Sequence, residues 1–188
     1  MAATTTVTIE YGMSNNQNID LISKGILFDV RKYPFLVYIR LFKSSGVVSE
    51  CSGSLISPLF VLTAAHCTDK IEANNIVVFH YYNLFMKSQQ YVKAVYQHKS
   101  YKKNLIYNDI SIIRLKYPFR NVNRYLNLSG HPDEFNDTAD WNCTVFGFGI
   151  SERSNNYEKL GYMTNLSVTY GYKKCFLDIL DYQFRFGC

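Results

Sequence analysis

One histidine and one aspartate in this sequence have the surroundings that a general-base pair requires. His66 is followed directly by Cys67, and Asp109 lies 43 positions further along the chain. A histidine that acts as a general base needs its ring held in one tautomer, which a buried carboxylate does by hydrogen bonding to it. Both residues border apolar, strand-like sequence, so strands could carry them to a shared site.

Other interpretations of these residues stay open on residue type alone. A lone histidine is more often structural, and an aspartate before an apolar strand is usually a turn or cap residue. The Cys67 and His66 neighbours could also form half of a metal site. The remaining histidines (His80, His98 and His131) and cysteines lack the spacing of zinc ligands, and no acidic loop suits calcium. We therefore expect no metal and no cofactor.

The elements around these residues are predicted to be short strands. Tyr (16) and Phe (13) are abundant, and aromatic and β-branched residues alternate with Ser, Asn, Lys and Gly clusters. Many short strands at this spacing indicate an all-β barrel or sandwich. Strands are expected at residues 35–42, 47–56, 60–65, 75–82, 91–98, 110–115, 141–148 and 160–170, and one short helix at 173–180.

Three segments together resemble one protein family. Residues 62–67 (Leu-Thr-Ala-Ala-His-Cys), with Cys-Ser-Gly-Ser from Cys51, resemble the histidine segment of a trypsin-like serine protease. Residues 109–115 (Asp-Ile-Ser-Ile-Ile-Arg-Leu) resemble its aspartate strand, and residues 141–149 resemble the segment that opens its second half. The resemblance implies two antiparallel six-stranded β-barrels, with His66 as the general base and Asp109 as the carboxylate that orients it.

The resemblance also implies how the five cysteines pair. Cys51 would pair with Cys67 and Cys175 with Cys188, which leaves Cys143 unpaired. In the family, the partner of Cys143 lies beyond the nucleophilic serine. No Gly-Asp-Ser-Gly-Gly nucleophile segment occurs in these 188 residues. We therefore expect a chain truncated before the catalytic serine, with an incomplete second barrel.

The N-terminal region departs from the family pattern. Ile22, followed by Ser, Lys and Gly, aligns with the mature N-terminus that activation cleavage would create. Leu21 replaces the basic residue that usually precedes the cleavage site. Lys24 replaces a glycine, and its charged side chain would fit poorly in the buried site into which the new N-terminus inserts. These two residues favour a chain that is not activated in the usual way.

Composition narrows the class of partner and the compartment. A net charge of +5 comes from scattered residues with no basic stripe, which argues against nucleic-acid binding, and no apolar stretch is long enough to span a membrane. Disulfide-like cysteine spacings and four Asn-x-Ser/Thr sequons (Asn127, Asn136, Asn142 and Asn165) favour a secreted protein. No signal peptide is visible in residues 1–20.

These observations lead to a domain division and to competing functions. We expect a propeptide-like lead at 1–21, a first barrel at 22–120, and a linker with a partial second barrel at 121–188. The principal hypothesis is a serine endopeptidase that acts on polypeptides, present here as a fragment or inactive without its serine. The alternative is a secreted, non-catalytic homologue that binds substrates or protease inhibitors. A decayed gene copy is the third possibility.

Overall fold

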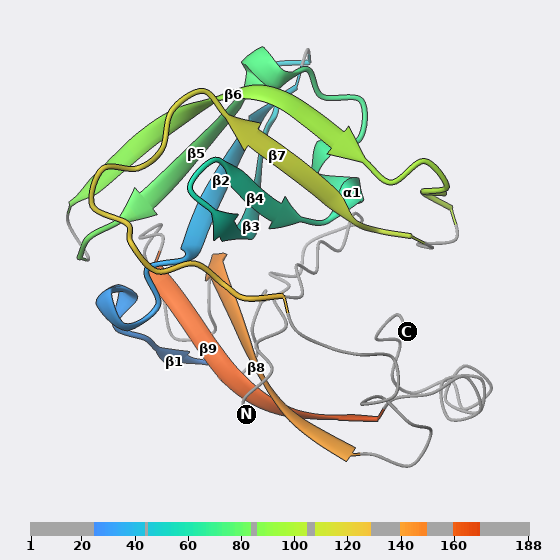
Figure 1. Ribbon diagram of the computed structural model, residues 1–188. Helices are drawn as coiled ribbons and strands as arrows, with labels where there is room; N and C mark the ends of the chain where they lie inside the picture. The colour runs from blue at the N-terminus through green and yellow to red at the C-terminus, as the bar shows by residue number, and fades with distance from the viewer. Residues whose placement is uncertain are drawn as a thin grey trace.

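The structure is a computed structural model, and it describes residues 25–43, 45–83, 86–104, 108–128, 140–149 and 160–169. Within these residues the secondary structure is almost entirely β-strand, as predicted (Figure 1). Six strands close into a barrel: β2 (Leu36–Phe42), β3 (Val48–Ser57), β4 (Phe60–Thr63), β5 (Ile76–Tyr81), β6 (Lys87–Gln97) and β7 (Ser111–Leu115). The barrel also carries the short helix α1 (Ala65–Thr68) and the 3₁₀ turn η2 (Ala73–Asn75).

Every neighbouring pair in the barrel is antiparallel, and the order around it is β2-β3-β4-β7-β6-β5. The barrel closes where Ile39 of β2 pairs with Val78 of β5. Side chains alternate along each strand, so in β7 Ser111, Ile113 and Leu115 point inward and are buried. Closure leaves none of these six strands with a free edge, and it encloses a core of aliphatic side chains.

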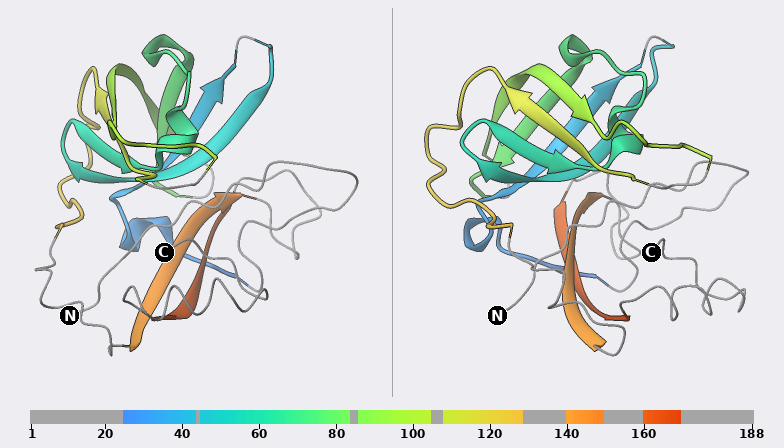
Figure 2. Two further views of the ribbon diagram at one scale, coloured as in Figure 1. Left: turned by 90° about the vertical axis from the view of Figure 1, so that its right-hand side faces the viewer. Right: turned by 45° about the vertical axis from the view of Figure 1, so that its right-hand side comes forward.

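Three further strands form a separate sheet beside the barrel. It contains β1 (Ile26–Leu27), β8 (Asp140–Gly149) and β9 (Leu160–Thr169), in the order β1-β9-β8. The views in Figure 2 show the β8–β9 ribbon, in orange and red, extending away from one end of the closed barrel. This arrangement of one closed barrel and one partial sheet agrees with the predicted all-β fold.

Aromatic side chains join the two sheets. Phe28, which follows β1, contacts the rings of Phe146 and Phe148 in β8 at centroid distances of 5.3 and 5.8 Å. Phe148 in turn stacks on Tyr81 of β5 at 5.5 Å. Gly161 in β9 leaves room for the Phe28 ring, since a Cβ there would lie 2.4 Å from it. All three phenylalanines belong to the same buried cluster as the barrel core.

All eight predicted strands are present, with changes at their ends. The sequence did not reveal β1, the 3₁₀ turn η1 (Val30–Lys32), η2 or the α1 turn that follows Thr63. The predicted helix at 173–180 lies outside the described residues, as do the segments around Leu21, Lys24, Cys175 and Cys188. In the part of the chain that is described, no helix combines the length and apolar character needed to cross a membrane.

Candidate active site

Strand pairing brings the histidine and aspartate segments to the same end of the barrel. β4 and β7 are antiparallel neighbours, with Thr63 opposite Ser111. The residues that leave β4 and the residues that enter β7 must therefore meet at that end. His66 lies in α1 just after β4, and Asp109 lies two residues before β7. Two segments 43 residues apart in sequence thus reach one site.

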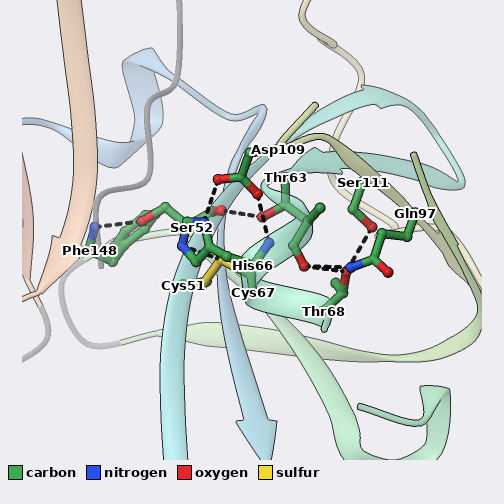
Figure 3. The surroundings of a disulfide bond; sticks show 11 residues. Cys51, Ser52, Thr63, His66, Cys67, Thr68, Gln97, Asp109, Ser111 and Phe148 are labelled. Atoms are coloured by element: carbon green, nitrogen blue, oxygen red, sulfur yellow. Dashed lines mark hydrogen bonds and ion pairs between the residues drawn. A yellow bond between two sulfur atoms is a disulfide. The ribbon is translucent and has the colours of Figure 1, made fainter. Parts of the chain in front are cut away.

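His66 and Asp109 make two hydrogen bonds with each other (Figure 3). The backbone N–H of His66 donates to Asp109 Oδ1 at 2.7 Å, and the ring Nδ1 lies 2.6 Å from Asp109 Oδ2. Because a carboxylate oxygen accepts, this contact assigns a proton to Nδ1, so in the neutral imidazole Nε2 keeps its lone pair. The two side chains are 20% and 18% exposed, so the pair is sheltered but reachable.

The turn before Asp109 fixes the direction of its side chain. Asn108 has a positive φ of 57°, a left-handed conformation that asparagine adopts more easily than most residues. Its side-chain amide donates to the carbonyl of Ser100 at 3.1 Å, which ties Asn108 to the segment that directly follows β6. Asp109 therefore follows a residue in a left-handed conformation and lies two residues before β7.

A disulfide holds the other side of the His66 turn. Cys51 of β3 and Cys67 of α1 are bonded, and Cys67 Sγ lies 3.5 Å from His66 Nε2. The sulfur atoms and the imidazole lie close enough together to suggest a metal site. In the disulfide, however, neither sulfur is a thiolate, which is the form that binds zinc. The pairing expected for these two cysteines is thus present, and its effect here is structural.

Hydroxyl and amide side chains of neighbouring elements hold the helix α1 in place, and no sequence motif indicated them. Thr68 Oγ1 donates to Ser111 Oγ at 2.9 Å, and the Gln97 side-chain amide donates to the carbonyl of Ala65 at 2.8 Å. These contacts connect α1 to β7 and β6. Gln97 and Thr68 belong to no recognised motif, so only their position in the fold identifies them.

Tyr101 adds no competing charge near the pair. Burial raises the pKa of the Tyr101 hydroxyl, and the negative charges of Asp109 and Asp69 raise it further. A phenol with a raised pKa stays neutral at physiological pH. The carboxylate in contact with the His66 ring is that of Asp109.

The structure tests the predicted cysteine assignments only in part. Among the described residues Cys143 is buried and forms no disulfide. Cys175 and Cys188 lie outside the described residues, so their pairing stays a prediction.

Comparison with known proteins identifies the family of this chain. The family model described as Trypsin matches residues 28–179. Serine protease SSP1 of Scolopendra subspinipes is 30% identical over 133 residues, which cover 66% of this chain and 46% of that protein. Chymotrypsin-C of Rattus norvegicus is 31% identical over 123 residues, covering 62% of this chain and 45% of that protein. The chain spans about half the length of these curated relatives.

Solved structures show the same fold. The structure described as "Structure of GrC" has a TM-score of 0.70 and 24% identity, covering 87% of this chain and 72% of its own. The scabies mite inactivated protease paralogue S-D1 has a TM-score of 0.70 and 21% identity, covering 85% and 67%. At these identities the likeness concerns the fold alone.

Proposed function

Because the chain belongs to the trypsin family, we propose that it supplies the base half of a serine endopeptidase site. His66 acts as the general base and then the general acid, and Asp109 orients its ring. The observation that carries this proposal is the 2.6 Å contact between His66 Nδ1 and Asp109 Oδ2. The substrate class is polypeptide, and the reaction is hydrolysis of a peptide bond.

The two oxygens of the Asp109 carboxylate have different hydrogen-bond partners and therefore different roles in the proposal. Oδ2 accepts from the ring, while Oδ1 accepts from the His66 backbone N–H. The backbone bond fixes the carboxylate relative to the chain, so the ring bond fixes the rotation of the imidazole as well as its tautomer. Nε2 is then the atom that removes a proton from an attacking hydroxyl and returns it to the leaving amine.

We propose that the nucleophilic serine lies outside these 188 residues, since no Gly-Asp-Ser-Gly-Gly segment occurs in them. We propose that residues 22–120 hold the base pair and that residues 121–188 belong to the half of the fold that presents the serine. We propose a Cys175–Cys188 disulfide in that half. Secretion is part of the proposal, since the Cys51–Cys67 disulfide is of the kind that persists in oxidising compartments.

The test is labelling with a fluorophosphonate, which reacts with a serine only when a neighbouring base activates it. The protein to label is the natural polypeptide that contains this sequence, immunoprecipitated from its source. The 188-residue chain should take up no label. In a recombinant copy of the natural polypeptide, His66→Ala should lower peptide hydrolysis by about 10⁶-fold. Asp109→Asn should lower it by about 10⁴-fold, because the ring then takes the wrong tautomer.

A matched control is His98→Ala. It removes the exposed histidine that directly follows β6 and should leave hydrolysis unchanged. If His66→Ala retained wild-type labelling while His98→Ala abolished it, the assignment of the base would be wrong.

A second function has specific support. Leu21 and Lys24 depart from the pattern that activation requires. A secreted homologue that binds polypeptides or protease inhibitors without cleaving them fits these features. It predicts that the natural polypeptide takes up no fluorophosphonate but retains binding to an immobilised protease inhibitor.

A further inference from the structure

Two of the four sequons lie directly opposite each other in the second sheet. Asn142-Cys143-Thr144 is in β8 and Asn165-Leu166-Ser167 is in β9. In the antiparallel register Asn142 pairs with Ser167, and Thr144 pairs with Asn165. Residues directly opposite in such a pair point to the same side of the sheet. The asparagine of each sequon therefore faces the hydroxyl residue of the other on one face.

This face divides into a covered half and an open half. Phe146 and Phe148 project on the same side as Asn142, but they are buried against the barrel core. Asn142, Asn165 and Ser167 are exposed. Figure 1 shows the reason, since the Asp140 end of β8 and the Thr169 end of β9 extend away from the closed barrel.

The opposite face of the same strands is apolar. Cys143 and Val145 are buried there, and Val145 packs with Tyr162. The alternation along β8 and β9 thus turns both sequon asparagines outward, while the cysteine between Asn142 and Thr144 turns inward.

We propose that Asn142 and Asn165 both carry N-linked glycans, and that this end of the β8–β9 ribbon is a glycan-covered face. The inference rests on the proposed secretion, because the transfer takes place in the secretory lumen. The side-chain Nδ2 forms a bond to the anomeric carbon of an oligosaccharide and loses a proton. The leaving group is the pyrophosphate of the lipid-linked oligosaccharide donor.

The folded structure accommodates both glycans. Thr144 Oγ1 lies 2.9 Å from Asn165 Oδ1 and donates to it. Glycan transfer modifies Nδ2 and leaves Oδ1 unchanged, so this hydrogen bond survives. Diagonal neighbours across an antiparallel pair are about 7–8 Å apart. Two sugar chains can therefore leave the sheet side by side.

The order of synthesis gives the two sites different opportunities. Thr144, which completes the first sequon, precedes Asn165 by 21 residues. At about 5–20 residues per second, this sequon is available for roughly 1–4 s before its partner strand exists. A hairpin forms in about 1–10 μs once both strands are present, and it then holds Asn165 in the ladder. Occupancy at Asn142 should therefore equal or exceed occupancy at Asn165.

The experiment is translation of the full 188-residue chain, behind a cleavable secretory leader, in the presence of endoplasmic reticulum microsomes. Asn127→Gln and Asn136→Gln form the background, so that only the paired sequons remain. Protease protection selects the translocated chains. Peptide-N-glycosidase in ¹⁸O water then marks each occupied asparagine for peptide mapping.

The expected result is two glycans per protected chain, one at each asparagine. Thr144→Val and Ser167→Ala should each remove one glycan, from Asn142 and Asn165 respectively. The matched control Asn123→Gln, an exposed asparagine outside any sequon, should remove neither. Absence of a glycan at Asn142 or at Asn165 from the whole population of protected chains would overturn the proposal, and occupancy greater at Asn165 would overturn the timing argument.

The supplied leader separates this result from the proposed secretion. Failure of the natural protein to appear outside cells would count against secretion, whereas an unmodified but protected chain counts against the glycans.

Discussion

The closed barrel of β2 to β7 encloses its own core, whereas the β1–β9–β8 sheet shares its core with the barrel. Ile39, Val61, Val78 and Ile113 are fully buried inside the barrel. The smaller cluster of the second sheet consists of Val145 and Tyr162 with Leu166 packed beside them, and its Phe146 and Phe148 belong to the barrel's cluster. This difference implies that the barrel folds as a unit, while the order of the second sheet depends on its contact with the barrel.

Shortening a core side chain of the barrel should lower the free energy of unfolding much more than the same substitution at an exposed position in the second sheet. Ile113→Ala in β7 should lower the free energy of unfolding by about 2–5 kcal/mol, because it leaves a cavity in a closed core. Ile26→Ala in β1 makes the same chemical change at a side chain that is 53% exposed. Urea denaturation followed by circular dichroism would measure both, and equal losses would contradict the difference between the regions.

The disulfide should contribute stability to the barrel alone. Cys51→Ala with Cys67→Ala opens a link with a sequence separation of 16 and should cost about 3 kcal/mol in the chain-entropy account. Cys143→Ala, which changes a buried cysteine that has no disulfide partner among the described residues, is the control. Its expected cost is about 1 kcal/mol, the usual effect of a point substitution. Thermal melts under non-reducing conditions would separate the two.

Each region contains a glycine at which an added Cβ atom would clash with a neighbouring side chain. A Cβ on Gly161 would meet the Phe28 ring at 2.4 Å, and a Cβ on Gly53 would meet Val61 Cγ1 at 2.7 Å. Each alanine substitution should cost about 1–3 kcal/mol through overpacking. Amide hydrogen exchange should show Gly161→Ala loosening β8 and β9 while the barrel amides stay protected, and Gly53→Ala loosening the whole barrel.

The Gly161 effect has an internal check. Phe28→Leu removes the ring that a Cβ on Gly161 would meet, so the double variant should lose less protection than the two single changes predict together. Additive losses would show that the clash at Phe28 is not the cause.

The smallest expected effect is a pH dependence that originates in the barrel. His80 is buried between Tyr82 and Phe119, and its ring nitrogens make no hydrogen bond among the described residues. Burial lowers the pKa of His80 below the ordinary 6.5, although the nearby Pro34 carbonyl opposes the shift. Below pH 6.5 the unfolded chain binds a proton that the folded chain does not. The contribution of His80 to the free energy of unfolding is therefore constant above about pH 6.5, and below that pH it falls by at most about 1.4 kcal/mol per pH unit.

Urea titrations between pH 7.5 and 5.5 would measure this slope. His80→Phe should flatten it, and His98→Phe, at an exposed histidine, should leave it intact. An unchanged slope in His80→Phe would assign the pH dependence to another group.

The sequence predicted the strands of the barrel because each is a short aromatic and β-branched run between turn residues. It missed the first four residues of β6, because Lys87, Ser88 and two glutamines are polar and alternate between exposed and half-buried positions. It also missed β1, because Ile26 and Leu27 become a strand only through pairing with Met163 and Tyr162. Such long-range pairing leaves no local signal.

The residues of the candidate site could be identified from sequence, but their supports could not. Local motifs surround His66 and Asp109, whereas Gln97 and Thr68 matter only because β6 and β7 pass beneath α1. The register of the sequons was equally invisible, since it depends on which residue of β9 faces Asn142.

Ser52 gives the two regions a common alignment point. Its carbonyl accepts the Thr63 hydroxyl at 2.9 Å, and its own hydroxyl accepts the backbone N–H of Phe148 at 3.1 Å. It is also the neighbour of Cys51, whose disulfide touches the His66 ring. In the proposed function the base and the nucleophile lie on different sheets and must stay in register, because a displacement of about 1 Å can cost 10²-fold in rate. Ser52 therefore sets the position of β8 relative to β4, because its two hydrogen bonds reach one strand in each region.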